Sequence, residues 1–370
     1  MALCRNDWIV GLDPLNLVRA ARHYERASQI LIREAVLSAR KFISVTPTQN
    51  KNAQNDCNWT IVESSARIDL SGGWSDTPPI AYEHGGAVTN IAVLVNGKRP
   101  IGAKARKMDC TRQGPNQTPQ EPFLKFVVRG GTDEIVTVTT IRQLQTYHQP
   151  QSPAALLKAA VCCAGLIDEH SPKSLADQLK EKFQGFGLEM QSWSDLPAGS
   201  GMGTSSILAG CCIAAVWSAM GMEYDNSSLY HAVLHLEQML TTGGGWQDQI
   251  GGIAPGMKYC TSAQGLPLHV STKPVEVPSK FLEKLSSHLV LIYTGKTRLA
   301  RDLLQNVLRN WYSLDPTIVQ NVQGLVENAT VCAQAASVGD LVTLGACVDT
   351  YWSQKKVMAP GCEPSFVTKI

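Results

Sequence analysis

The spacing of hydrophobic residues changes along the chain from a period of two to a helical period. In residues 60–70, the apolar Ile68 and Leu70 alternate with charged residues, which predicts a strand with Arg67 and Asp69 on its polar face. Further strands are expected over 87–95, 99–107, 123–129, 134–140, 186–191 and 288–293. Because the strands are followed by helices rather than strictly alternating with them, the pattern indicates an α+β fold.

Apolar residues at intervals of three and four predict the helices. The helices are expected over residues 1 to about 45, 153–167, 172–183, 204–220, 225–241, 298–312, 316–337 and 339–357. The most apolar segment, 207–222, is shorter than a membrane span and contains glycine and serine, so we expect a buried helix there. The polar stretch 47–56 predicts a linker, after which the main domain begins near Trp59.

Composition places the 370-residue chain among ordinary globular proteins, with 44% hydrophobic and 17% charged residues. A formal charge of +2 gives no reason to expect nucleic acid or a membrane surface as a partner. The N-terminal sequence has no basic region followed by an apolar run, so a secretory signal is not expected. The 11 cysteines include no CxxC pair, and an odd count argues against a disulfide framework. We therefore expect a cytoplasmic protein.

A glycine-rich loop lies between an expected strand and the apolar helix. In LPAGSGMGTSS (196–206), Gly199, Gly201 and Gly203 allow sharp turns and leave backbone N–H groups accessible. The positive end of the following helix points at the same place, which predicts an anion site. The loop does not have the GxxxxGK[ST] or GxGxxG pattern, which argues against a P-loop or a dinucleotide site. A tight turn that binds nothing is the alternative.

Three segments in order resemble the GHMP small-molecule kinases, a family that includes galactokinase and the homoserine, mevalonate and phosphomevalonate kinases. PAGSGMGTSS (197–206) is similar to the family's Pro-x-Gly-x-Gly-x-Gly-Ser-Ser loop. Upstream, ARIDLSGGWSDTPP (66–79) resembles the first motif in its fucokinase and heptose-phosphate kinase version. Downstream, Glu237 and TTGGGWQDQIGG (241–252) resemble the family's glutamate and acidic substrate-site motif. MAPGCEP (358–364) resembles the fucokinase branch, and the resemblance covers roughly residues 59–364.

The resemblance implies a GHMP kinase fold, with one half like domain 2 of ribosomal protein S5 and a ferredoxin-like second half. On that basis we expect a helical segment and linker over 1–58, an ATP-binding domain over 59–255 and a C-terminal domain over 256–370. The implied reaction transfers a phosphoryl group from ATP, with Mg²⁺, to a sugar. In the fucokinase branch the sugar is L-fucose and the product is L-fucose 1-phosphate, for GDP-fucose salvage.

The resemblance also assigns roles to residues whose own chemistry suits them. ATP would be held by the glycine loop, through Pro197, Gly199, Ser200, Gly201, Met202, Gly203, Thr204, Ser205 and Ser206. Asp248 would orient or deprotonate the sugar hydroxyl, and Arg67 would keep Asp248 ionised and offset charge on the phosphate. The alternatives are an Asx-turn for Asp248 and a surface ion pair for Arg67.

Glu237 is expected at the edge of the apolar stripe of its helix, where it would bind Mg²⁺ together with Ser205. A border glutamate without a ligand is the alternative. On the same helix, His231 and His235 are four residues apart and fall opposite the stripe. Because no HExxH pattern or cysteine pair accompanies them, we expect surface histidines rather than zinc ligands.

Three further residues are expected at the sugar. Asp76 resembles the family's ligand for sugar hydroxyls, with a turn carboxylate before Pro78 as the alternative. Trp74 and Trp246 are candidate stacking surfaces for the sugar, although both are also typical core aromatics.

The family's third motif is a Gly-rich strand and loop that follows the MAPGCEP segment by a few dozen residues. This sequence ends six residues after that segment, at Ile370, and contains no such glycine run after Gly256. We therefore expect an incomplete C-terminal half with exposed strand edges and apolar helix faces. The alternatives to an active fucokinase are a non-catalytic chain that retains nucleotide or sugar binding and a kinase for another substrate, such as a heptose phosphate or homoserine.

Overall fold

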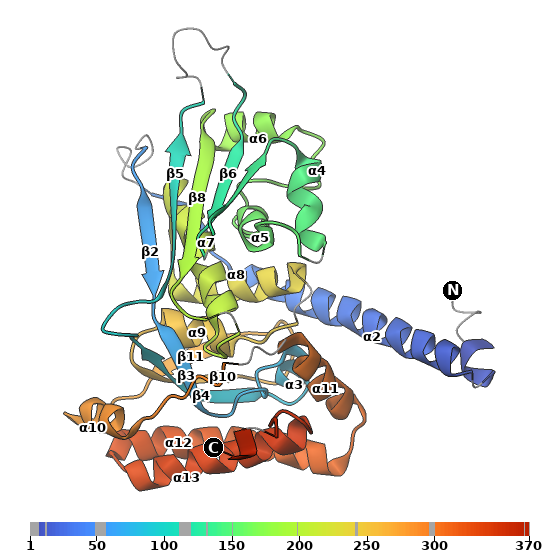
Figure 1. Ribbon diagram of the computed structural model, residues 1–370, viewed down its shortest axis with the longest axis vertical. Helices are drawn as coiled ribbons and strands as arrows, with labels where there is room; N and C mark the ends of the chain where they lie inside the picture. The colour runs from blue at the N-terminus through green and yellow to red at the C-terminus, as the bar shows by residue number, and fades with distance from the viewer. Residues whose placement is uncertain are drawn as a thin grey trace.

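The computed structural model describes residues 7–11, 13–48, 57–110, 120–130, 132–149, 151–197, 199–240, 243–295, 300–365 and 367–369. Two large sheets lie at opposite ends of the long axis, and helices pack on both (Figure 1). This is the mixed arrangement of strands and helices that the sequence predicts.

The first sheet has five strands in the order β2-β5-β8-β6-β7. Its strands are β2 (Thr60–Ser64), β5 (Ile101–Met108), β6 (Leu124–Val128), β7 (Glu134–Val138) and β8 (Gly187–Ser194). Strands β6 and β8 are parallel, and the other neighbours are antiparallel. The glycine loop follows directly after the end of β8, at residues 196–203.

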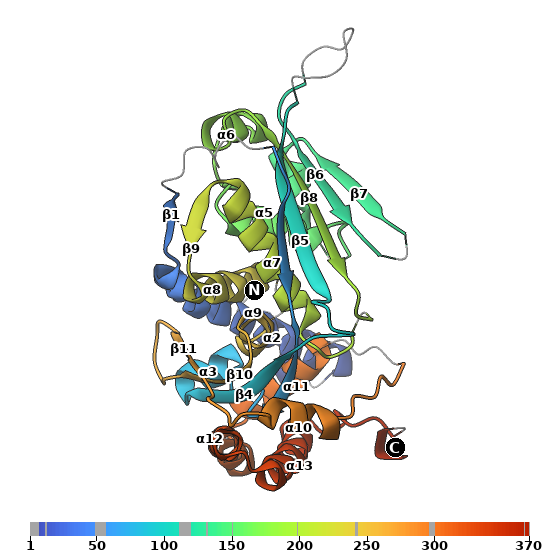
Figure 2. The ribbon, with the colours of Figure 1, turned by 90° about the vertical axis from the view of Figure 1, so that its left-hand side faces the viewer.

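Helix α7 (Thr204–Ala219) covers one face of this sheet, and α5 (Ala155–Cys163) and α8 (Asn226–Met239) pack against α7 (Figure 2). The sequence of α7 is apolar all round, and the helix is correspondingly buried on nearly every side. It forms the centre of the largest core cluster, together with residues of β5, β8 and α5. The position of its N-terminus, where the glycine loop ends, is therefore fixed by the core.

The second sheet has four antiparallel strands in the order β11-β10-β4-β3. They are β3 (Ala66–Ser71), β4 (Gly86–Val93), β10 (Met257–Ser262) and β11 (Val270–Pro274). Helix α9 (Gln247–Ile253) packs on β3 and β4, and α12 (Pro316–Val338) and α13 (Leu341–Met358) form the outermost layer (Figure 1). Asp315 and Asp340 cap the N-termini of α12 and α13 through hydrogen bonds to backbone N–H groups.

The remaining elements surround these two layers. They are α2 (Pro14–Leu37), η1 (Ser38–Phe42), β1 (Val45–Pro47), α3 (Pro78–Glu83), α4 (Ile141–Leu144), η3 (Gln145–His148), α6 (Leu175–Lys182), β9 (Met222–Tyr224), α10 (Phe281–His288), α11 (Ala300–Tyr312) and η4 (Val367–Lys369). Strands β1 and β9 pair with each other. In the described ranges, no helix combines the length and apolar content that crossing a membrane requires.

One predicted strand is wrong. Residues 289–295 follow α10 without regular secondary structure, and Val290 is 78% exposed. A short apolar run fits a buried strand or a helix equally well by pattern alone, and it becomes a strand only beside a hydrogen-bonding partner. No strand of the described chain pairs with this run.

The predicted domain boundary at residues 255 and 256 passes through the second sheet. Strands β3 and β4 lie before this boundary in sequence, whereas β10 and β11 follow it, yet β10 pairs with β4. The division of the chain at this point stays a prediction.

Candidate active site

The glycine loop has the backbone conformation that its sequence predicts. Gly199, Gly201 and Gly203 have φ angles of +68°, +75° and +72°, which disfavour any other residue type. Gly203 directly precedes Thr204, the first residue of α7, so the unpaired N–H groups of the helix open into the loop. Met202 is 6% exposed and anchors the loop to the body of the protein. Ala198 lies outside the described residues.

Arg67 and Asp248 form an ion pair between β3 and α9. Nη2 of Arg67 donates to Oδ1 of Asp248, and Nη1 of Arg67 lies 2.6 Å from Oδ2 of Asp69. Burial opposes the charge of Arg67, but Asp248 and Asp69 together raise its pKa above the ordinary value. The side chains of Arg67 and Asp248 are 10% and 30% exposed, so the carboxylate stays accessible beside a permanent positive charge.

This ion pair touches the glycine loop directly. A Cβ atom placed on Gly203 would lie 3.0 Å from Nε of Arg67 and 3.1 Å from Cβ of Asp248. The positive φ of Gly203 and this close approach both require glycine. Segments from β3, the glycine loop and α9, which are far apart in sequence, therefore meet at the N-terminus of α7.

Glu237 also reaches the first turn of α7. Ser206 donates a hydrogen bond of 2.6 Å from Oγ to Oε1 of Glu237, and the glutamate is 4% exposed. Ser205, the predicted partner of Glu237, faces solvent on the same turn. A carboxylate beside a serine hydroxyl offers oxygen ligands, which hard cations such as Mg²⁺ prefer. Glu237 and Ser206 thus fit the metal, and the assignment of Ser205 and Glu237 as its ligands stays a prediction.

Asp76 links the segments 66–79 and 241–252 through hydrogen bonds. Its carboxylate accepts hydrogen bonds from the backbone N–H groups of Trp74, at 2.9 Å, and Gln247, at 3.1 Å. Asp76 is 1% exposed, and burial raises its pKa to about 6, although the N–H group of Gln247 opposes this shift. Gly245 lies so close that an added Cβ would be 2.0 Å from Oδ2 of Asp76. These contacts account for the buried carboxylate without a ligand, and its binding to sugar stays a prediction.

The two tryptophans lie in different surroundings. Trp74 is 8% exposed and has a φ angle of +80°, a costly conformation for a residue with a side chain. Trp246 has no exposed surface and packs in the core formed by α8, α9 and β10. Trp246 can therefore receive a sugar only if that core opens. Thr241 and Thr242, which begin the same motif, lie outside the described residues.

The prediction of surface histidines is wrong. His231 and His235 are 1% and 7% exposed, because α8 is enclosed on its predicted polar face as well as on its apolar stripe. Burial lowers the pKa of both imidazoles, that of His235 to about 4. Nδ1 of His231 lies 2.8 Å from the carbonyl oxygen of Ser227. Two neutral, packed histidines are thus part of the core.

Helix α13 brings residues to the site that the sequence analysis did not identify. The ammonium group of Lys355 lies 4.0 Å from the ring centroid of Trp74, and its pKa is lowered by burial although Asp69 opposes this shift. The hydroxyl group of Tyr351 is buried without a hydrogen-bond partner among the described residues. An added Cβ on Gly73 would lie 2.2 Å from this hydroxyl oxygen. Asp69 was visible as a neighbour of Arg67 on one strand face, but nothing in the pattern connects α13 to this strand.

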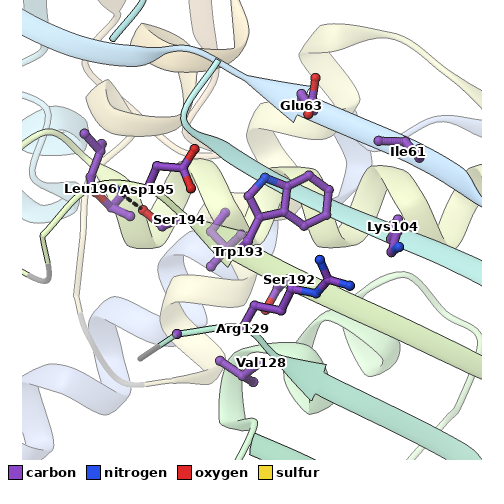
Figure 3. A pocket seen from close by; sticks show the side chains of 13 residues that line it. Ile61, Glu63, Lys104, Val128, Arg129, Ser192, Trp193, Ser194, Asp195 and Leu196 are labelled. Atoms are coloured by element: carbon purple, nitrogen blue, oxygen red, sulfur yellow. Dashed lines mark hydrogen bonds between the residues drawn. The ribbon is translucent and has the colours of Figure 1, made fainter. Parts of the chain in front are cut away.

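A cavity of about 830 Å³ opens beside the glycine loop (Figure 3). Trp193, Ser194 and Asp195, at and after the end of β8, line it together with Lys104 of β5. Thr204 and Leu208 extend the lining to the first two turns of α7. A half-buried indole, flanking charged groups and a helix N-terminus at one end describe a small-molecule site of common size. Apart from residues of the glycine-loop segment, no residue that lines this cavity was predicted from the sequence.

The fold and the glycine loop together are those of a GHMP kinase. Residues 170–255 match the family described as GHMP kinases N terminal domain, a range that contains the loop, α7, α8 and Asp248. This range of the chain belongs to that family.

Within the family, the chain is similar to fucokinases. It is 34% identical over 322 residues to the L-fucokinase/L-fucose-1-P guanylyltransferase of Bacteroides fragilis, which covers 83% of this chain and 31% of that protein. It is 29% identical over 311 residues to the bifunctional fucokinase/GDP-fucose pyrophosphorylase of Arabidopsis thaliana, covering 84% and 27%. The chain thus spans less than a third of the length of these two relatives.

A solved structure confirms the fold independently. The D-glycero-D-manno-heptose 1-phosphate kinase from Bacteriodes thetaiotaomicron superposes with a TM-score of 0.52 at 15% identity, covering 81% of this chain and 80% of that one.

Proposed function

We propose that this chain transfers the γ-phosphoryl group of ATP to a hydroxyl group of a sugar, and that the sugar is L-fucose. The product is then L-fucose 1-phosphate, which is consumed in GDP-fucose salvage. The observation that carries the proposal is the contact between Gly203 and the Arg67–Asp248 pair. It brings a phosphate-binding loop and an accessible carboxylate within one site, as phosphoryl transfer requires. The similarity to two fucokinases supports the choice of sugar.

ATP is proposed to extend from the cavity to the loop. The base packs against the indole of Trp193, since an aromatic platform suits any nucleobase. The phosphates then reach the N–H groups at Gly201, Gly203 and the start of α7, where the helix dipole favours negative charge. Mg²⁺, held by Glu237 and the serine hydroxyls of α7, would neutralise charge on the β- and γ-phosphates when bound.

The Arg67–Asp248 pair acts on the acceptor. Asp248 accepts a hydrogen bond from the reacting hydroxyl and takes its proton as the hydroxyl oxygen bonds to the γ-phosphorus and the bond from that phosphorus to the leaving ADP breaks. Arg67 pairs with the carboxylate of Asp248 before the transfer and offers its guanidinium to the negative charge of the phosphoryl group during it. Because Asp69 holds the other side of the guanidinium, Arg67 keeps one orientation throughout.

The proposed location of this activity is the cytoplasm. Every cysteine that the structure describes is a free thiol, as expected in a compartment that keeps thiols reduced.

The test is a coupled assay of ADP release with ATP–Mg²⁺ and L-fucose, with Asp248→Asn as the matched variant. We expect turnover by the wild type and a loss of about 10²–10⁴-fold in kcat for Asp248→Asn, with ATP affinity nearly unchanged. Turnover that survives this substitution would show that the mechanism is wrong.

Two other outcomes separate the remaining possibilities. Nucleotide or sugar binding without turnover would identify a non-catalytic chain. Turnover with a heptose phosphate but not with L-fucose would identify a kinase for another acceptor, of the class for which the similar solved structure is named.

A further inference from the structure

Lys258 of β10 is buried although it carries a charge. It is 1% exposed, and lysine is almost never buried to this extent without a partner. Its ammonium group donates hydrogen bonds to the backbone carbonyl oxygens of Gly251 and Ala254, each at 2.7 Å. No carboxylate of the described chain lies within ion-pairing distance of it. The charge of Lys258 is therefore balanced mainly by two carbonyl groups.

These two carbonyl groups belong to the C-terminal end of α9. Gly251 lies in its last turn, and Ala254 is the residue that follows Ile253 at the cap. The last carbonyls of a helix have no partner within it and carry the negative end of its dipole. A lysine ammonium group at this position donates hydrogen bonds to the free carbonyl oxygens and places a positive charge at the negative end of the helix dipole.

Helix α9 carries Asp248 in its first turn and is only seven residues long. Because the helix is so short, a displacement of its C-terminal end moves Asp248 by nearly the same distance. The helix lies directly on its neighbours: an added Cβ on Gly251 would be 2.9 Å from Cβ of Arg67, and one on Gly252 would be 2.4 Å from Cδ1 of Ile207. Glycine at these two positions lets α9 approach Arg67 and Ile207 closely, so a displacement of the helix also moves Asp248 relative to Arg67.

We propose that Lys258 is a positioning residue, which holds α9 by its C-terminal carbonyl groups so that Asp248 stays aligned with Arg67 and the glycine loop. This inference rests on the proposed function, in which Asp248 acts on the acceptor hydroxyl. Misplacement of a reacting group by about 1 Å costs roughly 10²-fold in rate, so a loss of this size is expected without Lys258.

The protonation of Lys258 adds a dependence on pH. Burial lowers its pKa to about 8, although Cys260 and Asp69 oppose this shift. Of the other elements that contact β10, β4 carries no ionisable side chain, and Lys273 of β11 and Glu327 of α12 are exposed. The thiol of Cys332 on α12 is buried, and burial raises its pKa, so it stays uncharged. Above about pH 8 the amine keeps its N–H groups but loses its charge, and with it the attraction to the helix end.

The experiment compares Lys258→Met, Lys258→Arg and the control Lys273→Met. Lys273 lies opposite Tyr259 on the neighbouring strand and is exposed, so its substitution tests general effects on this sheet. We expect Lys258→Met to lower kcat by roughly 10²-fold with little change in the KM for ATP, because the glycine loop is not attached to Lys258. In the wild type, kcat should fall above pH 8, and Lys258→Arg should move this fall to higher pH because a guanidinium stays charged.

Hydrogen–deuterium exchange of residues 246–254 provides a readout that does not need turnover. We expect exchange to be at least about tenfold faster in Lys258→Met than in Lys273→Met. Wild-type kcat and protection in Lys258→Met would overturn the inference, as would identical pH profiles for the wild type and Lys258→Arg. If Lys258→Met does not fold, the inference is tested by the kcat pH profiles of the wild type and Lys258→Arg and by the hydrogen–deuterium exchange of Lys258→Arg. If the wild type transfers no phosphoryl group, the proposed function fails, and exchange still decides whether Lys258 holds α9.

Discussion

At the scale of single residues, the site depends on the ability of one guanidinium group to serve two carboxylates. Arg67 bonds Asp248 with one terminal nitrogen and Asp69 with the other. Lysine has the same charge but a single ammonium group, which cannot reproduce this planar, two-sided geometry.

We therefore expect Arg67→Lys to fold but to lose at least about tenfold in kcat. Lysine keeps the positive charge but can hydrogen-bond only one of the two carboxylates in the geometry of the guanidinium, so the other loses its direct partner. The measurement is the coupled kinase assay combined with urea denaturation. A variant with wild-type kcat would mean that only the charge of Arg67 matters.

The buried carboxylate of Asp76 should make stability depend on pH in an unusual direction. Because its pKa is about 6 in the folded protein, against 3.8 ordinarily, the folded state binds the proton more tightly than the unfolded state. The charged form therefore destabilises the fold above pH 6, and this cost disappears as the pH falls towards 4.

Relative to Asp76→Asn, the wild type should gain up to about 3 kcal/mol in its free energy of unfolding between pH 7 and pH 4. Urea denaturation of both proteins at intervals of one pH unit measures this difference. A difference that stays constant with pH would contradict the shifted pKa.

At the scale of elements, the loop before α9 depends on the absence of a side chain at residue 245. The backbone at Gly245 lies against Asp76, and an added Cβ would be 2.0 Å from Oδ2. Since Asp76 is held by two backbone N–H groups, neither partner can move freely.

Gly245→Ala is expected to lower the free energy of unfolding by roughly 1–3 kcal/mol and to reduce kcat, because the loop and α9 must shift together. Gly345 of α13 has no atom within 4 Å of an added Cβ and serves as the control. There, alanine should stabilise the helix by roughly 0.5–1 kcal/mol. Thermal denaturation and the kinase assay compare the two variants, and equal effects would contradict the proposed collision.

The elements with strong local signals could be predicted from the sequence. Helix α12 was expected over 316–337 and spans Pro316–Val338, because Asp315 and Pro316 define its start and Gly339 its end. Strands β10 and β11 and helix α9 were not predicted. The buried face of β10 carries Lys258, Cys260 and Ser262, so its sequence lacks the usual alternation of apolar and polar residues. Gly251 and Gly252 weaken the helical pattern of α9.

The residues of the candidate site also fall into those that the sequence predicts and those that it does not. The sequence motifs identify the glycine loop, Arg67, Glu237 and Asp248, and the structure brings the loop together with Arg67 and Asp248. Lys355 contacts Trp74 from a distant segment of the chain, and Lys258 hydrogen-bonds the end of α9 from the strand that follows it. No sequence motif marks either contact. The prediction that His231 and His235 lie at the surface is wrong for a related reason. Neighbouring elements bury the face of α8 that its own sequence indicates as polar.

At the scale of the whole molecule, α7 joins the two halves of the site. Its first turn carries the glycine loop, its length packs on the five-stranded sheet, and it also contacts α9 of the other sheet. Binding at its N-terminus should therefore stabilise both sheets together.

A non-hydrolysable ATP analogue with Mg²⁺ is expected to raise the unfolding temperature of the chain in a single transition. At a concentration of 100 times Kd, the stabilisation is about 2.7 kcal/mol. Differential scanning calorimetry with and without the analogue measures it. Two transitions, of which only one shifts, would show that the sheets unfold separately.

The apolar run after α10 has a practical consequence for anyone who purifies the protein. Leu289 to Tyr293 are uncharged, rich in strand-forming residues and 39–78% exposed, which is the composition of a segment that self-associates through its backbone. Solubility, rather than folding, should then limit the concentration that can be reached. A single charge in this run, as in Val290→Lys, should raise the soluble concentration and leave the kinase activity unchanged, which light scattering and the kinase assay can establish side by side.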